Sequence, residues 1–357
     1  MSYDIILAVD YHDENTVIRQ FDERRKVEST CTVPSSAAAL LQVVQEARKQ
    51  RWRGGQVVWI QESTSGWARV QALLQDQVKF QLANVVQMPR LPKGHRQKTD
   101  RTDTARILRE YRNGSLPQAH QPSAWWRQIR RLVCLRENLV NRRTALRNWI
   151  NRYLAHETWE SRVGLWSAKG MVRLRHYAKG LPEWDHIVVG IKLTELEQLE
   201  VPLSRVEAQM HEVYRHWPEA QQLDAVKGIG VIAAVAIAAR IGPVQRFRNA
   251  EALIAFAGLA PGVRQSDATR RTGRIGGGGT DFHLRHYLIE ATVWARALPR
   301  YRPTYERVAK RRGTKVGRLV VARLLLRSIF KVLRDGQRFN GEASNQAVPI
   351  DLTPATP

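Results

Sequence analysis

DIILAVD, residues 4–10, and VVWIQE, residues 57–62, are short apolar runs that each end in a carboxylate. Continuous runs of large apolar residues are typical of strands that are buried on both faces in the middle of a sheet. The two stretches therefore predict central strands that carry Asp10 and Glu62 at their ends.

The segments around these strands alternate between strand and helix patterns. They predict strands over Thr16–Phe21 and Lys26–Val33, a helix over Ala37–Lys49 capped by Ser35 or Ser36, a helix over Trp67–Leu74, a strand over Phe80–Val86 and a helix over Lys98–Tyr111. Three strands followed by helix, strand, helix, strand and helix is the order of an RNase H-like fold. The first part of the chain is therefore predicted to be an α/β domain of that kind.

The middle of the chain has a different pattern, with leucines at helical three-and-four spacing. One set runs from Leu132 to Tyr153, and a second runs from Leu193 to Val213 with Pro202 inside it. Two long helices with apolar seams are consistent with a helical hairpin inside one chain or with a coiled coil that joins two chains. The sequence leaves both alternatives open.

The third part of the chain is predicted to be mainly helical. Gly228 and Gly230 open an Ala-rich helix that ends at Ile241, an arrangement similar to a helix-hairpin-helix element, although small residues also allow close helix packing. A basic, Gly-rich loop is expected over Arg264–Gly279, with helices over Phe282–Ala297 and Val316–Leu333. The predicted domains are residues 1–120 (α/β), 121–220 (helical, coiled coil), 221–338 (mainly helical) and a disordered tail over 339–357.

The charge of the chain points to a polyanionic partner. Among 357 residues, Lys and Arg total 57 and Asp and Glu total 33, which gives a formal net charge of +24. Basic side chains release condensed counterions when they contact phosphate backbones, so nucleic acid is the expected ligand. The alternative is attraction to a membrane surface, but the basic residues are spread over several segments instead of one amphipathic helix.

Cysteines and apolar runs exclude several classes of protein. Cys31 and Cys134 are too few for a disulfide framework or a zinc site. Neither a signal peptide nor an apolar run of the roughly 18 residues that a membrane span needs is apparent. We therefore expect a soluble, cytoplasmic protein.

Four acidic residues of the first domain suggest a metal site. Asp10 and Glu62 end neighbouring strands, and Asp100 and Asp103 are three residues apart, on one face of a predicted helix. Clustered carboxylates repel one another unless a cation lies between them, and hard oxygen ligands suit Mg²⁺ or Mn²⁺. The alternative is a set of solvated acids, with Asp100 as a helix cap and His12 as a surface histidine.

Several blocks of sequence together resemble insertion-sequence family one-ten, whose transposases carry a DEDD carboxylate set and are related to site-specific DNA invertases. The blocks are LAVD, WIQES, KTDRTDTARIL, GIGVIAAVAIAARIG, RFRNAEALIAFAGLAPGVRQS and GRIG. The resemblance as a whole covers nearly the entire chain, roughly Tyr3 to Phe339. The resemblance implies a RuvC-like first domain, donor and target DNA as substrates, and a guide RNA encoded by the element.

The resemblance also assigns roles to residues. It places the DEDD set on Asp10, Glu62, Asp100 and Asp103, and the serine nucleophile of the family on Ser266. The family has Gly after this serine, where this chain has Asp267, and the basic residues that often follow GRI are replaced here by residues 276–279, all glycine. Residues expected to contact nucleic acid are Lys93, Arg96, Lys98, Arg101, Gly228, Gly230, Arg264, Arg270, Arg271 and Arg274.

The function expected from this sequence is metal-assisted, serine-dependent exchange of DNA strands by an RNA-guided homo-oligomer. A second hypothesis is a RuvC-like endonuclease in which water attacks the phosphate and Ser266 takes no part. A third is a nucleic-acid-binding protein without catalytic activity. The complete carboxylate set argues against the third hypothesis.

Overall fold

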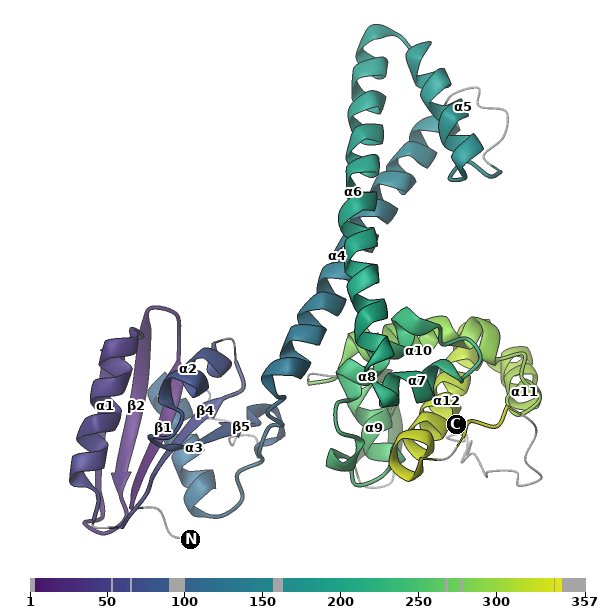
Figure 1. The fold of residues 1–357 in the computed structure, drawn as a ribbon. Coiled ribbons are helices and arrows are strands. Elements are labelled where there is room, and N and C mark those ends of the chain that lie inside the picture. The colour runs from purple at the N-terminus through teal and green to yellow at the C-terminus, as the bar shows by residue number, and fades with distance from the viewer. Residues whose placement is uncertain are drawn as a thin grey trace. The chain divides into compact units, whose positions relative to one another are not determined.

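The computed structural model describes residues 4–52, 54–64, 66–89, 100–156, 163–266, 269–276, 279–336 and 338–341, and over 261–274 it describes only the backbone. The chain divides into two compact units, Met1–Gln121 and Pro122–Pro357. The first unit is a mixed sheet with helices and the second is mostly helical (Figure 1). Among the described residues, no helix combines the length and apolarity that crossing a bilayer requires.

The first unit is built on a five-stranded sheet with the order β3-β2-β1-β4-β5. The central strand β1 pairs antiparallel with β2 and parallel with β4, and its residues are all buried. This order is consistent with the RNase H-like arrangement expected from the sequence. The strands are β1 (Ile5–Tyr11), β2 (Asn15–Asp22), β3 (Val27–Pro34), β4 (Val57–Glu62) and β5 (Lys79–Ala83).

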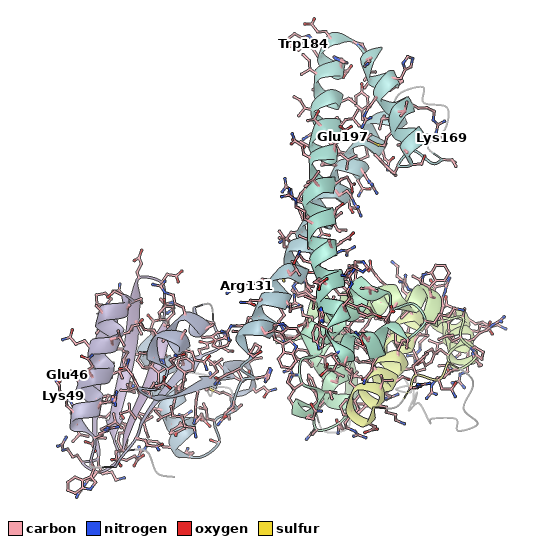
Figure 2. All side chains as sticks on the ribbon, in the orientation of Figure 1. Glu46, Lys49, Arg131, Lys169, Trp184 and Glu197 are labelled. Atoms are coloured by element: carbon pink, nitrogen blue, oxygen red, sulfur yellow. The ribbon has the colours of Figure 1, made fainter. Side chains whose placement is uncertain are left out.

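Helices cover both faces of this sheet, because successive residues of β1 and β4 point to opposite faces and are apolar on each face. Ile5, Leu7 and Val9 pack with α1 (Ala37–Gln50) and α2 (Trp67–Leu74), whereas Ile6 and Ala8 pack with α3 (Asp100–Arg112) on the other face. Ser36 caps α1 by accepting a hydrogen bond from the Ala39 amide, as the sequence predicts. The outer face of α1 is exposed and carries the Glu46–Lys49 ion pair (Figure 2).

The second unit begins with a long antiparallel helical hairpin. Helices α4 (Ala124–His156) and α6 (Glu183–Arg215) pack on one another, and α5 (Ala168–Lys179) packs against α6. The leucine seams lie inside this hairpin, and ion pairs such as Arg136–Glu207 (2.9 Å) and Arg143–Glu200 (3.6 Å) join the two long helices. Of the two alternatives left open by the sequence, the structure has the hairpin within one chain.

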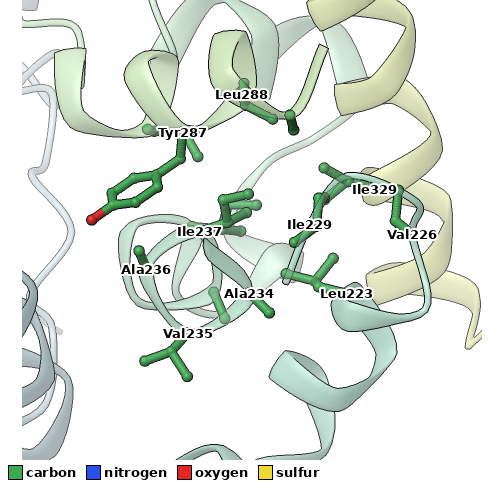
Figure 3. Packing of buried hydrophobic residues seen from close by; sticks show 14 of the residues in the cluster. Leu223, Val226, Ile229, Ala234, Val235, Ala236, Ile237, Tyr287, Leu288 and Ile329 are labelled. Atoms are coloured by element: carbon green, nitrogen blue, oxygen red, sulfur yellow. The ribbon is translucent and has the colours of Figure 1, made fainter. Parts of the chain in front are cut away.

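The remaining helices of the second unit form a globular core around α8 (Val231–Ile241). Nearly all of α8 is buried, because its alanines allow the surrounding helices to approach closely (Figure 3). The surrounding elements are α7 (Pro218–Asp224), η2 (Val244–Arg246), α9 (Ala250–Phe256), α10 (Phe282–Ala295), α11 (Arg302–Arg312) and α12 (Thr314–Asp335).

Some expected elements differ from the structure. The loop predicted over Arg264–Gly279 is wrong: the backbone forms an antiparallel hairpin of β6 (Pro261–Ser266) and β7 (Thr269–Ile275), because β-branched residues favour extended backbone and the glycine run begins only after β7. The strand predicted to reach Val86 ends at Ala83 and is followed by the 3₁₀ turn η1 (Val85–Gln87). Leu135, expected in the first seam, is exposed. The predicted tail lies outside the described residues from 342 onward.

Gly228 and Gly230 offer a test of how this core is packed. Gly228 has φ +97°, and a Cβ added there would lie 2.7 Å from the Ala291 carbonyl oxygen, whereas a Cβ at Gly230 would meet nothing within 4 Å. Gly228→Ala should therefore lower the free energy of unfolding of the second unit by about 2–5 kcal/mol. Urea denaturation monitored by tryptophan fluorescence measures this, with Gly230→Ala as the matched control. Equal stability of the two variants would contradict the packing described here.

Candidate active site

Asp10 and Glu62 lie at the same end of two neighbouring parallel strands. The pairing of β1 with β4 places Val9 beside Gln61, so the residues that follow them are neighbours. Side chains alternate along a strand, so Asp10 and Glu62 are on the side of Ala8 and Ile60, the face covered by α3. The sheet therefore presents two carboxylates to the N-terminus of that helix.

Asp100 and Asp103 occupy the first turn of α3, where acidic side chains are favoured by the helix dipole. Arg19 of β2 holds this turn: its guanidinium donates to the Thr104 hydroxyl (3.4 Å) and to the Arg101 carbonyl (3.1 Å), and also pairs with Glu28. Asp10, Glu62, Asp100 and Asp103 all line one pocket of about 300 Å³. The structure thus brings the four predicted carboxylates together.

His12 also belongs to this pocket. Its Nε2 lies 3.4 Å from an oxygen of Asp10 and 3.7 Å from an oxygen of Asp100. The loop that carries it is fixed, because the Ser35 hydroxyl donates to the His12 carbonyl (2.5 Å) and is hydrogen-bonded to Thr16 (2.7 Å). From the sequence, His12 was expected to be a surface histidine, whereas in the structure it is the basic group that pairs with Asp10 among the described residues.

The electrostatics of the pocket centre on Asp10, which is 6% exposed. Burial raises the pKa of Asp10 above its ordinary value, and the charges of Asp100 and Asp103 raise it further, while His12 opposes them. His12 lowers the pKa of Asp10 by more than the charge of Asp100 or of Asp103 raises it, so burial is the main cause of the raised pKa.

The donor set suits a divalent cation. One oxygen from each of Asp10 and Asp100 and a nitrogen of His12 lie within 4.8 Å of one another, and Glu62 and Asp103 line the same pocket. Carboxylate oxygens on an open pocket match the preference of Mg²⁺ and Mn²⁺ for oxygen ligands with positions left for water or phosphate. The residues present therefore fit a hard metal ion, bound mainly by the four carboxylates.

Ser266 is placed by the backbone of the second unit. It is the last residue of β6 and pairs with Thr269, the first residue of β7, so it lies at the turn end of the hairpin. Arg264 pairs with Arg271 two positions away, and Arg270 and Arg274 are on β7. Four arginines therefore share the short hairpin that carries the serine.

The other residues expected to bind nucleic acid are distributed over both units. Arg101 is exposed in the first turn of α3, one residue from Asp100. Gly230 is the N-cap of α8, and Gly228 packs closely against α10. Lys93, Arg96 and Lys98 lie outside the described residues.

Two features of the site were not predicted from the sequence. Arg19 was not singled out, although its register opposite Ala8 places it on the face of the sheet that meets α3. Tyr11 also lines the pocket, and a Cβ at Gly66 would lie 2.6 Å from its ring, so the glycine (φ +86°) lets the start of α2 approach β1. The one hint in the sequence of this close approach is the position of Gly66 shortly after the WIQES block.

Comparison with known proteins gives consistent matches along most of the chain. A transposase family model named for a DEDD transposase of insertion sequence IS110 matches residues 7–157, and the model of the IS116/IS110/IS902 transposase family matches residues 220–308. The first match includes all four carboxylates of the pocket, and the second includes Ser266.

The individual relatives share about a quarter to a third of the matched residues with this chain. The chain is 30% identical over 220 residues to a putative transposase of Sinorhizobium fredii, which covers 60% of this chain and 52% of that protein. It is 30% identical over 207 residues to a probable family 20 transposase of Pseudomonas aeruginosa (57% and 60% covered), and 26% identical over 172 residues to the transposase of insertion sequence element IS1111A of Coxiella burnetii (46% of each covered). The matched segments thus span about half of the curated relatives.

One family model matches the part of the chain that contains the carboxylate pocket, and the other matches the part that contains the serine hairpin. The chain therefore belongs to the IS110 family of transposases.

Proposed function

We propose that this protein cuts and rejoins DNA by attack of Ser266 on a phosphodiester, assisted by divalent metal ions at Asp10, Glu62, Asp100 and Asp103, and guided by an RNA of its own element. The observation that carries the proposal is the convergence of four carboxylates on one pocket of the first unit. The guide RNA rests on the family resemblance, and the charge of +24 is suited to binding both RNA and DNA.

The four carboxylates would hold the metal ions and position the scissile phosphate. Bound divalent ions polarise a phosphate and stabilise the oxygen that leaves it. Asp10 is held in place by its strand and by burial, and Arg19 holds the turn of α3 that carries Asp100 and Asp103. Arg101 is next to Asp100 in the sequence and is exposed, so it would contact a neighbouring phosphate group. Rigid placement of the ligands favours a single geometry of the reacting groups.

Ser266 would supply the nucleophile. Its hydroxyl loses a proton to solvent as Oγ bonds to phosphorus, the bond from phosphorus to the 3′ oxygen breaks, and that oxygen leaves as a 3′ hydroxyl. The product, a 5′ phosphoseryl linkage, keeps the phosphodiester bond energy, so a 3′ hydroxyl of another strand reverses the step and joins the DNA. Arg264, Arg270, Arg271 and Arg274 on the same hairpin would stabilise the added negative charge.

Several copies of the chain would act together. The leucine seams of α4 and α6 are used within one chain, so a contact between copies needs another surface. At the end of α6 distant from the core, Trp184 is 75% exposed, and the neighbouring exposed residues Ile187, Val188 and Ile191 continue at helical spacing (Figure 2). This apolar stripe supports assembly into a homo-oligomer.

The second candidate function is hydrolysis by a RuvC-like endonuclease, in which water attacks at the same carboxylate pocket. It is favoured by the location of Ser266 in a different compact unit from the carboxylates. The two functions differ in whether DNA becomes bound covalently to the protein.

The first prediction of this proposal concerns the metal ligands. Asp10→Asn and Asp103→Asn should each abolish DNA cleavage in Mg²⁺ and leave nucleic-acid binding largely intact, because the carboxylate charge is lost and the basic surfaces are unchanged. In the presence of EDTA, Asp10→Asn should be at least as thermally stable as the wild type, since a charged carboxylate no longer has to be buried. Gel assays of cleavage and binding, with Glu46→Gln on the outer face of α1 as control, measure this. Cleavage by either variant at the normal rate would remove that residue from the mechanism.

The second prediction concerns the nucleophile. Incubation with a cognate DNA junction and Mg²⁺ should attach DNA covalently to the wild-type protein through Ser266 and a 5′ phosphate. Ser266→Ala should form no adduct and cut no DNA, whereas Ser266→Cys should keep weak activity because a thiolate also attacks phosphorus. Denaturing gels and peptide mass spectrometry detect the adduct. Normal cleavage by Ser266→Ala without an adduct in the wild type would establish the endonuclease instead.

The third prediction concerns assembly. If one copy supplies the carboxylates and another supplies Ser266, a mixture of the Asp10→Asn and Ser266→Ala proteins contains some intact composite sites. Random pairing into dimers should restore about a quarter of the wild-type activity. Each variant alone serves as its own inactive control. No restored activity, together with a monomeric mass in the presence of nucleic acid, would show that each site is formed within one chain.

A further inference from the structure

A second cluster of metal-ligating side chains lies in the helical unit, on the facing sides of α4 and α10. Cys134 and Glu137 are three residues apart on α4, and His283 is in the first turn of α10. One ligand atom from each residue lies within 4.8 Å of the other two, and His283 Nδ1 contacts a carboxylate oxygen of Glu137 directly. The three side chains are partly buried, so solvent still reaches the cluster.

Two buried oxygens beside this cluster make no hydrogen bond of ordinary geometry with a described residue, although Tyr287 is close enough to interact with Glu137 and Arg136. One is Oε1 of Glu137, and the other is the hydroxyl of Tyr287, which is 2% exposed and lies one turn after His283. The ring of Tyr287 packs on the apolar core while its hydroxyl points away from the labelled core side chains (Figure 3). The negative charge of Glu137 is close enough to add to the effect of burial in raising the pKa of Tyr287. Buried polar groups with poor hydrogen-bond geometry gain from a further partner, and a bound ion would supply one to the Glu137 carboxylate.

A basic and an acidic side chain lie next to Cys134. Arg240 at the end of α8 donates from Nη2 to Cys134 Sγ (2.9 Å), and its Nη1 is 3.7 Å from the carboxylate of Asp281. Asp281 partly offsets the charges of Arg240 and Arg130 near Cys134, and Glu137 supplies a carboxylate ligand. Hydrogen bonds of this kind to a ligand are typical of the shell around protein metal sites.

We propose that Cys134, Glu137 and His283 bind a transition-metal dication such as Zn²⁺, at a site separate from the carboxylate pocket. A thiolate and an imidazole nitrogen select this class of ion over Mg²⁺, which prefers oxygen ligands. With Zn²⁺ bonds of about 2.0–2.3 Å, tetrahedral ligand atoms lie roughly 3.5 Å apart, so small side-chain rotations close the site. Two cysteines exclude a cysteine-rich zinc site but not this mixed ligand set.

The bound ion would connect the long helical hairpin to the globular core of its own unit. Cys134 and Glu137 are in the part of α4 that packs on α6 and the core, and His283 begins α10. A metal bond between these helices would fix the base of α4 against α10, and metal binding of this kind stabilises the folded state. The site depends on neither the serine mechanism nor the identity of the substrate.

Cobalt titration tests the proposal. Full-length protein stripped of metal with a chelator and titrated with Co²⁺ should develop a thiolate-to-cobalt charge-transfer band with one equivalent bound, and Zn²⁺ should displace it. Oxygen ligands alone, as at the carboxylate pocket, give no such band. The band should be lost in Cys134→Ser, and His283→Gln should weaken Co²⁺ binding at least tenfold. Zn²⁺ should raise the melting temperature of the wild type but not of Cys134→Ser.

Two controls make the result specific. Cys31→Ser removes the exposed cysteine of the first unit, and Asp10→Asn alters the carboxylate pocket, so both should keep the band. Circular dichroism verifies that each variant is folded, and His283→Gln, at a partly exposed position, provides a second ligand variant if Cys134→Ser is unstable. Absence of the band in folded wild-type protein, or its loss in Cys31→Ser, would overturn the proposal and leave Glu137 and His283 as an ordinary ion pair.

Discussion

The burial of one carboxylate, Asp10, beside other acids is the constraint on which the first unit depends. Asp10 is almost fully removed from water on the central strand, next to two acids at the start of α3. Such a group destabilises the fold unless a cation or a proton neutralises it. The sheet tolerates it because β1 is paired on both sides and its apolar residues pack on both faces. The packing of the sheet therefore compensates for the energetic cost of the buried Asp10 carboxylate.

The same division between scaffold and site recurs in the second unit. Its core is formed by small and apolar residues of α8 that pack closely with α6, α7 and α10. In the part of the chain that the structure describes, the serine hairpin has two strands and joins no larger sheet. Isolated two-stranded hairpins are marginally stable. Rigid packing is thus found in the core of each unit, and the residues proposed for catalysis or for metal binding lie at the ends of strands, at the starts of helices or on the hairpin, except for Cys134 and Glu137 within α4.

Features that depend on residues close together in the sequence could be predicted, and features that depend on contacts between distant residues could not. The strand ends at Asp10 and Glu62 and the helical pair Asp100 and Asp103 were apparent from periodicity, and their meeting in one pocket followed from the order of the strands. Arg19 and the cluster of Cys134 with His283 depend on contacts between residues far apart in sequence, which periodicity does not reveal. The β6–β7 hairpin was mistaken for a loop, because the glycine run after Ile275 outweighed the weaker strand signal before it.

The β6–β7 hairpin also has a mechanical consequence. At about 3.4 Å per residue, a six-residue strand carries Ser266 roughly 17 Å from the start of the hairpin at Pro261. With that lever arm, a rotation of about 10° at the base displaces the serine by about 3 Å, which is the length of a hydrogen bond. Contacts near the tip, from bound nucleic acid or from another copy of the chain, would therefore determine the final position of the hydroxyl more than the core to which the hairpin is attached.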